Sequence, residues 1–123
     1  MRGRRNSEDA TGPAGRPRRV LVLGAVQVIP ELARELSGAV VVIGSYEAIT
    51  AQLIGRNAPD MVLAPLVAAE YDITDLAERL VRAGFRGRLR AYTRRLPDPR
   101  MVRAELRAGW PELEVDLIEL RGG

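Results

Sequence analysis

The sequence predicts an α/β fold of three layers, in which helices cover both faces of a parallel sheet. Five short apolar runs alternate with four stretches whose apolar residues recur at helical spacing, and glycine or proline separates many of them. Strands that alternate with helices pair in parallel through right-handed crossovers. The chain has 123 residues, the length of one domain. We therefore expect one five-stranded sheet with four helices.

The first half of this pattern begins with the unbroken apolar run Val20–Leu23, which Gly24 ends. Such a run is typical of a strand buried on both faces. Proline in a first turn, followed by apolar residues on one face, predicts a helix over residues 29–37. The β-branched run Ala39–Ile43 predicts the second strand, and Ser45 can cap the helix that follows it.

The second half continues the alternation. Asp60–Leu66 predicts the third strand, and Asp72 is the expected N-cap of the next helix. Leu89–Thr93 predicts the fourth strand. Asp98 and the proline after it give a strong signal for the start of the fourth helix. Glu112–Leu120 predicts the fifth and last strand.

The last two predicted strands alternate charged and apolar residues, unlike the first three. Arg88 and Arg90 alternate with apolar residues in one, and Glu114 and Asp116 do so in the other. This pattern predicts strands with one solvated face. If the two strands are neighbours, the opposite charges can pair across them for roughly 0.2 to 1 kcal/mol each.

Composition narrows the chemistry that the chain can perform. All 19 basic residues are arginine, and there is no lysine, histidine or cysteine. The chain therefore lacks the commonest general base, thiolate ligands and nucleophiles, and a phosphate-binding or Schiff-base lysine. We expect a protein that is not an enzyme and that holds no cofactor and no metal.

The first 18 residues differ in composition from the rest. They are rich in arginine, glycine and proline, with Met1 as the only large apolar side chain, which predicts a disordered tail before a domain over residues 19–123. One hypothesis is that this tail makes a weak electrostatic contact with nucleic acid, anionic lipid or an acidic partner. We do not expect nucleic acid to be the main partner of the protein. Without an apolar signal or a membrane-length run, we expect a cytoplasmic protein that does not bind membranes.

At the level of local sequence the chain resembles the receiver domain of bacterial response regulators over roughly residues 19–120. Val20–Leu23 resembles the first strand of that family, Pro59–Leu66 its third and Ala91–Thr93 the end of its fourth. An Ala-Gly pair at residues 108–109 is also similar to the family pattern before strand five. The resemblance implies the flavodoxin-like strand order 2-1-3-4-5, with a crevice beyond the carboxyl ends of the strands.

The phosphorylation site of the family is degenerate in this chain. Gly24 and Ala25 stand where receivers carry acidic magnesium ligands, and Pro65 stands where they carry the phosphorylated aspartate. Only Thr93 matches the expected hydroxyl, and the final lysine is absent. A receiver also continues into a final helix after strand five, which this sequence lacks, so the charged rows of the last two strands are expected to be uncovered.

These features favour a phosphorylation-independent pseudo-receiver that acts as a regulatory protein-protein interaction module in bacterial signalling. We expect an interaction surface at Arg88, Arg90, Glu114 and Asp116, an unknown protein partner and a homodimer. Trp110 is either an anchor for the partner or a lid on the core. A second hypothesis is a small-ligand or nucleotide-binding domain that uses the crevice through Gly24, Gly44, Ser45, Thr93 and Arg94.

Overall fold

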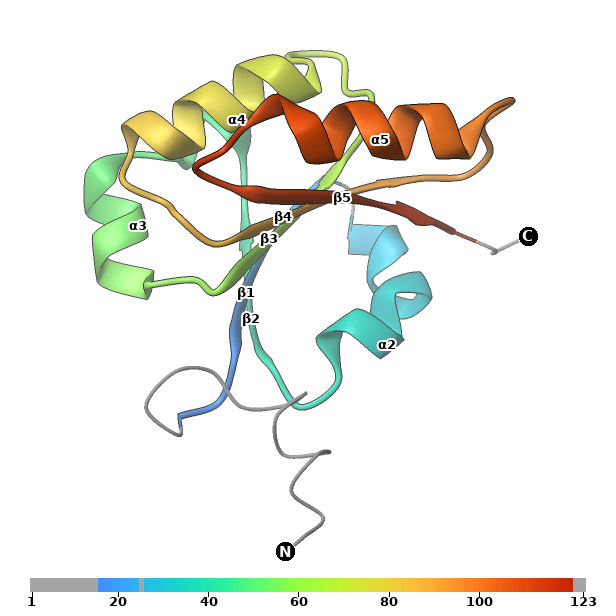
Figure 1. Cartoon of the computed structure of the whole chain (residues 1–123). Helices are drawn as coiled ribbons and strands as arrows, with labels where there is room; N and C mark the ends of the chain where they lie inside the picture. Colours follow the sequence, from blue (N-terminus) through green and yellow to red (C-terminus); the bar gives the residue numbers. More distant parts are fainter. Residues whose placement is uncertain (1–15, 25, 121–123) are drawn as a thin grey trace, which may run out of the picture.

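The structure is a computed structural model that describes residues 16–24 and 26–120. Five parallel strands form one sheet in the order β2-β1-β3-β4-β5, which is flavodoxin-like and confirms the predicted fold class (Figure 1). The last described element is a strand. The elements are β1 (Arg19–Leu23), η2 (Val26–Leu32), α2 (Ala33–Leu36), β2 (Val40–Gly44), η3 (Tyr46–Ala48), α3 (Ala51–Asn57), β3 (Met61–Pro65), α4 (Ile73–Arg82), β4 (Arg88–Thr93), α5 (Pro99–Gly109) and β5 (Glu114–Glu119).

Two of the predicted helices have a different form. The helix expected over residues 29–37 is a 3-10 segment, η2, followed by the four residues of α2. Pro30 lies inside η2. Inside an α-helix the proline ring clashes with the carbonyl four residues earlier, which disfavours a regular helix at this position. Ser45 does not cap α3. Thr50 does, because its Oγ1 accepts the N–H of Leu53 at 3.1 Å.

The other two helices begin where the sequence predicts. Asp72 and Asp75 form a reciprocal capping box at the start of α4, with N···O distances of 2.8 and 3.1 Å. Asp98 accepts the N–H of Met101 at 3.2 Å, and proline occupies the first turn of α5. No described helix is long and apolar enough to cross a membrane.

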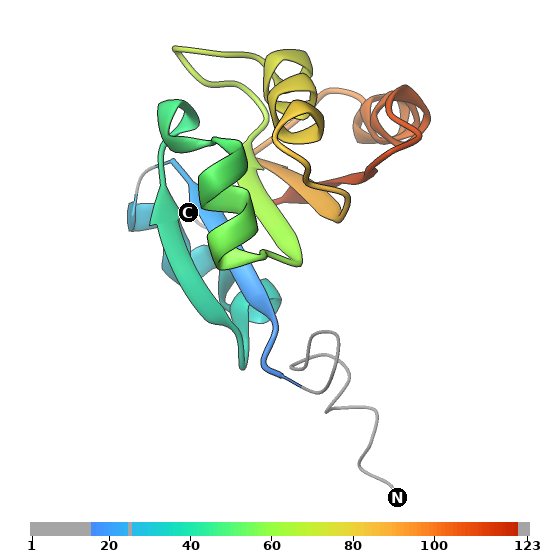
Figure 2. The same ribbon diagram turned by 90° about the vertical axis from the view of Figure 1, so that its left-hand side faces the viewer.

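The sheet separates two cores of unequal size (Figures 1 and 2). Helices α3, α4 and α5 cover one face, over side chains that include Leu21, Val62, Leu89 and Val115. On the other face η2 and α2 cover a smaller cluster, whose buried members are Val20, Val22, Val28, Leu32, Leu36, Met61, Leu63, Tyr92 and Leu120. The second face is therefore covered mainly over its middle.

The described residues begin inside the predicted tail. Residues 1–15 lie outside the described part of the chain, so most of the tail hypothesis falls there. Arg16 lies 3.7 Å from the carboxylate of Asp60, and Arg18 donates to the carbonyl of Glu35 at 2.6 Å. These two arginines thus contact the domain.

Candidate functional site

The carboxyl ends of β1, β3 and β4 meet at the corner where the resemblance places the degenerate phosphorylation site. Gly24 follows β1, and Pro65 ends β3 in register with Tyr92 of β4. The buried Tyr92 hydroxyl donates to the carbonyl of Leu23 at 2.6 Å. A tyrosine ring and a proline therefore line this corner. Ala25 lies outside the described residues.

The Tyr92 hydroxyl fits beside Gly24 because glycine has no side chain. The Gly24 φ of +110° is rarely adopted by residues with a side chain. A Cβ at this position would lie 2.1 Å from the Tyr92 hydroxyl and 3.4 Å from Cδ of Pro65. The glycine thus serves a close packing contact within the protein.

Two more tyrosines cover the neighbouring part of the same end of the sheet. Tyr46 follows β2 and Tyr71 follows β3, and their rings stack with centroids 4.5 Å apart at 12°. The Arg79 guanidinium lies 4.7 Å from the centroid of the Tyr46 ring, and its Nε donates to the carbonyl of Ile49 at 3.0 Å. All three tyrosines of the chain therefore lie at the carboxyl ends of strands.

Burial raises the pKa of two of these tyrosines, whose phenols are neutral at pH 7 even with their ordinary pKa. It raises the pKa of Tyr71 to about 12, with smaller contributions from neighbouring Tyr92 and from nearby acidic side chains. Burial also raises the pKa of Tyr92 above 10.0. At neutral pH both side chains are thus un-ionised phenols, which provide neither a base nor an anionic metal ligand.

The remaining predicted crevice residues add no reactive group. Thr93 is half-buried, and its carbonyl accepts the N–H of Leu120 at 2.7 Å. Arg94 forms a bidentate ion pair with Glu31, in which Nη2 lies 2.6 Å from Oε2. A Cβ on Gly44 would lie 3.0 Å from Leu21 Cδ1, so a core side chain already fills that space.

The described residues do not bring together the donors of a metal site. No group of three or more acidic, histidine or cysteine side chains forms a cluster within them. At the corner of Gly24 and Pro65 the Tyr92 hydroxyl is used for a structural hydrogen bond. None of Gly24, Pro65 and Tyr92 carries a carboxylate that could take a phosphoryl group.

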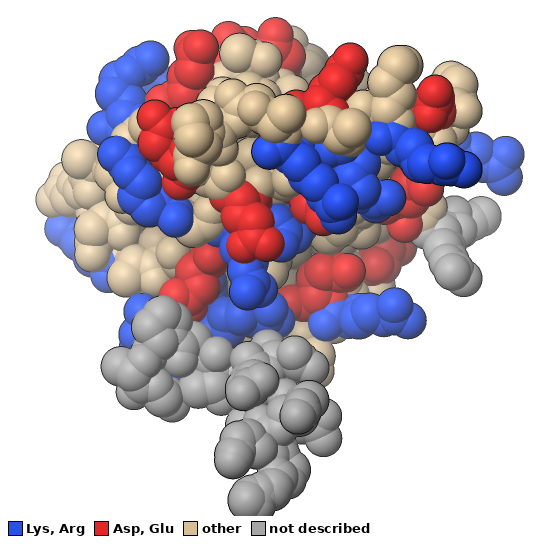
Figure 3. Space-filling view, in the orientation of Figure 1, with Lys and Arg blue, Asp and Glu red and all other residues tan. Residues whose placement is uncertain are grey.

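The charged residues of β4 and β5 lie on the face opposite α3, α4 and α5, as the alternation predicted. We call Arg88, Arg90, Glu114 and Asp116 the charged face. Arg88 is opposite Glu114 and pairs with it at 3.3 Å, which confirms the predicted cross-strand pairing. Arg90 is opposite Asp116 but instead contacts the Glu114 carboxylate at 3.3 Å and its carbonyl at 2.8 Å. Figure 3 shows basic and acidic side chains interspersed on one side of the molecule.

Asp116 turns away from Arg90 because α5 supplies two other arginines. Nε of Arg103 lies 2.9 Å from its carboxylate, and Nη2 of Arg107 lies 2.8 Å from it. The carboxylate also accepts the N–H of Leu117 at 2.8 Å, while Arg103 donates to the carbonyl of Leu117 at 2.9 Å. This network, which we call the β5 guard, occupies both backbone groups of Leu117.

Burial and hydrogen bonding act in opposite directions on Asp116. Partial burial raises its pKa, but hydrogen bonds from Arg107, the Leu117 N–H and Arg103 outweigh burial and hold the pKa below 3.8. Arg103 and Arg107 were not predicted from the sequence to be functional residues. They are four residues apart, and so lie on one side of the helix that precedes an acidic strand, which is the signal that could have predicted their contact with Asp116.

Trp110 does not belong to the charged face. It follows α5, is half-buried, and packs against the larger core cluster on the opposite face of the sheet. Its carbonyl accepts the N–H of Leu113 at 3.1 Å. This position fits the core-lid interpretation.

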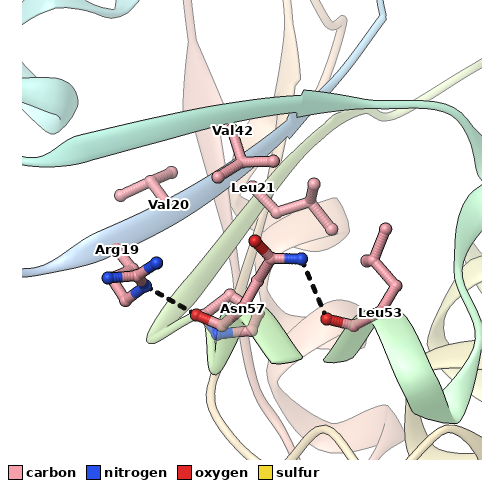
Figure 4. A pocket seen from close by; sticks show the side chains of 7 residues that line it. Arg19, Val20, Leu21, Val42, Leu53 and Asn57 are labelled. Atoms are coloured by element: carbon pink, nitrogen blue, oxygen red, sulfur yellow. Dashed lines mark hydrogen bonds between the residues drawn. The ribbon is translucent and has the colours of Figure 1, made fainter. Parts of the chain in front are cut away.

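A narrow crevice between β1, β2 and α3 has mostly apolar walls (Figure 4). At its mouth Nε of Arg19 donates to the carbonyl of Asn57 at 2.6 Å, and Asn57 donates to the carbonyl of Leu53 at 3.0 Å. A wider groove at the amino ends of the strands includes Arg16 and Asp60. Neither the crevice nor the groove is lined by Gly24 or Pro65. The polar groups at the mouth of the crevice already have protein partners.

Comparisons with protein-family models, curated proteins and solved structures find no match to this chain. The function is therefore inferred from the fold and from the residues themselves. The flavodoxin-like fold hosts many unrelated activities, so its strand order alone does not select one.

Proposed function

We propose that this protein is a phosphorylation-independent pseudo-receiver, a regulatory module that binds another protein in bacterial signalling. The observation that carries the proposal is the corner at Gly24 and Pro65, which the Tyr92 hydroxyl fills and where proline stands in place of the receiver aspartate. Phosphoryl transfer to a receiver needs an acidic nucleophile and a magnesium ion held by carboxylates. With that chemistry absent, a surface contact is the function that the remaining residues support.

The charged face is the surface that we assign to the partner. Arg88 and Glu114 have side chains that are 53% and 67% exposed, and they lie where η2 and α2 do not cover the sheet. Alternating charges of both signs favour a protein partner with a complementary pattern, since complementary potentials give specificity and fast association. We also propose that the protein forms a homodimer.

The first experiment addresses the missing chemistry. We expect that wild-type protein incubated with magnesium and a small phosphodonor forms no acyl phosphate, as measured by intact-protein mass spectrometry. Pro65→Asp is also expected to remain unmodified, because the metal ligands and the lysine would still be absent. A stable phosphoryl adduct on the wild-type chain would contradict the proposal.

The second experiment addresses the partner. Immobilised wild-type protein and Arg88→Glu protein are exposed to the same extract of the native host. We expect one or more proteins to bind the wild type and to be lost from the variant, because the reversal places two acidic side chains together. Arg100→Glu, at an exposed position of α5 outside the charged face, is the matched control and should bind like wild type. Equal capture by all three proteins would remove the charged face from the proposal.

A further inference from the structure

The outer strand β2 has backbone groups on its free edge that find no partner among the described residues. The N–H of Val40 donates to the carbonyl of Arg18 at 2.8 Å, on the side of β1. Successive residues of a strand direct their N–H and C=O alternately to its two sides. The groups of Val41 and Ile43 therefore point away from the sheet. In residues 16–24 and 26–120 no hydrogen bond reaches these four groups.

The side chains of the same strand are apolar and exposed. Val40, Val41 and Ile43 are 41%, 38% and 47% exposed, and no charged residue occurs from Leu36 to Tyr46. Natural sheets usually protect an edge with charge, proline or a bulge. β2 has none of these and lies at the open side of the sheet (Figure 2).

We propose that β2 is a homodimer interface, in which a second copy of the chain pairs antiparallel with it about a two-fold axis at Val42. In this register Val41 lies opposite the partner's Ile43. The two residues exchange N–H···O=C hydrogen bonds, so the outward groups of β2 in both copies are all used. The two five-stranded sheets then become one continuous sheet.

A second copy fits this edge because β2 is complementary to itself. Pairing about the axis places the β-branched side chains of Val41 and the partner's Ile43 in direct cross-strand contact, which is favourable in antiparallel sheets. The same pairing brings no like charges together, because the strand and its flanks carry none. An isologous contact of this kind closes as a dimer and does not extend into a fibre.

The other outer strand is unsuited to the same contact. In β5 the outward N–H and C=O of Leu117 are already bonded to Asp116 and Arg103. This contact rests on the homodimer proposed above and gives it a location, but it does not depend on partner binding, since β2 and the charged face lie at opposite ends of the strand order. A monomeric wild type would therefore remove the homodimer and leave partner binding untouched.

The association is tested by sedimentation equilibrium of the full chain over the micromolar range. We expect a monomer-dimer equilibrium for the wild type. Val41→Pro removes an N–H that points away from β1. Edge strands tolerate proline at such positions, so the variant should still fold. Ile43→Lys places charge in the contact. Each change should raise the dissociation constant about tenfold or more, and salt should not dissolve the wild-type dimer.

Val67→Lys is the matched control, because this loop valine is 81% exposed and lies outside β2. It should dimerise like wild type, and circular dichroism should show that all variants are folded. A strictly monomeric wild type would overturn the proposal. So would full dimerisation of folded Val41→Pro and Ile43→Lys proteins.

A cysteine scan tests the register, because the chain has no cysteine of its own. Val42 and the partner's Val42 form the non-hydrogen-bonded pair, with Cα atoms about 4.5 Å apart, which lies within disulfide range. Val42→Cys should therefore form an intermolecular disulfide much faster than Ile43→Cys, whose neighbour across the axis is the partner's Val41. Faster crosslinking of Ile43→Cys, or equally fast crosslinking of Val67→Cys, would overturn this arrangement.

Discussion

The two outer strands of the sheet, β2 and β5, present opposite surfaces to their surroundings. β2 exposes valine and isoleucine, and its outward backbone groups have no partner among the described residues. β5 carries acidic residues, and side chains occupy the outward N–H and C=O of Leu117 at its centre. An unprotected edge is a template for pairing with another strand. The difference indicates that only one edge of this sheet is suited to extension.

The β5 guard also changes what the outer edge of β5 offers. At Leu117, in the middle of this edge, the outward backbone groups are occupied by the Asp116 carboxylate and by Arg103 of α5. The charged face beside it remains exposed at Arg88 and Glu114. The β5 end of the sheet is therefore suited to a side-chain contact, whereas β2 is suited to a backbone contact.

The largest effect is expected from removing the acidic centre of the β5 guard. Asp116→Ala deletes the acceptor for the Leu117 N–H and for two arginines. Loss of hydrogen bonds to a charged group should lower the free energy of unfolding by roughly 1 to 3 kcal/mol. It should also open the edge, so that the protein forms species larger than a dimer. Urea denaturation and light scattering measure the two effects.

The control for this change is Glu119→Ala, which removes an exposed carboxylate from the same strand. It should leave both the stability and the assembly size close to those of the wild type. If Asp116→Ala protein keeps the wild-type assembly size while its stability falls, the network stabilises the fold but does not protect the edge. The contrast between the two strands would then be wrong.

A second, smaller effect concerns pH, to which the β5 end should respond and the β2 contact should not. The pKa of Asp116 is held below 3.8 in the folded protein. A depressed carboxyl pKa gives stability that is present above the unfolded-state pKa and is lost as the pH falls through the folded-state pKa. Between about pH 5 and about pH 3 the urea midpoint should therefore fall more for wild type than for Asp116→Asn. β2 has no titratable group, so dimerisation should change little over pH values at which the protein stays folded.

A parallel fall of the two urea midpoints would contradict this assignment to Asp116. Wild type and Asp116→Asn differ only in one carboxylate, which the variant replaces with an amide, so the other carboxylates contribute equally to both proteins. At high salt the urea midpoints of the two proteins should converge, because screening weakens the attraction between the Asp116 carboxylate and the exposed Arg107.

The two arginines of the guard should differ in importance. Arg103 contacts both the Asp116 carboxylate and the Leu117 carbonyl and is 35% exposed. Arg103→Ala should cost roughly 1 kcal/mol and expose the edge carbonyl. Arg107 contacts the carboxylate alone and is 60% exposed, so Arg107→Ala should cost less. Urea denaturation of the two alanine variants tests this order, and equal losses would contradict the special role of Arg103.

The fold could be predicted from the sequence because its signals are local. Apolar runs gave the strands, and the side chains of Asp72 and Asp98 cap backbone groups within their own helical turns. The replacement of a regular helix by η2 was missed, although Pro30 is a local signal for it. The closing of the corner was missed for another reason, because Tyr92 and Leu23 are 69 residues apart in the sequence. No periodicity reveals such a contact.

The smallest effect is expected on the charged face. Glu114→Gln weakens the ion pairs with Arg88 and Arg90 but keeps the Glu114 carbonyl that Arg90 also contacts. Because the carboxylate is 67% exposed, water and salt already screen it, and the loss of stability should be about 0.2 to 1 kcal/mol. Dimerisation through β2 should not change, since β2 lies at the other end of the sheet. A tenfold change in the dimer dissociation constant, measured by sedimentation equilibrium, would instead place the dimer contact on the β5 side and reverse the roles of the two outer strands.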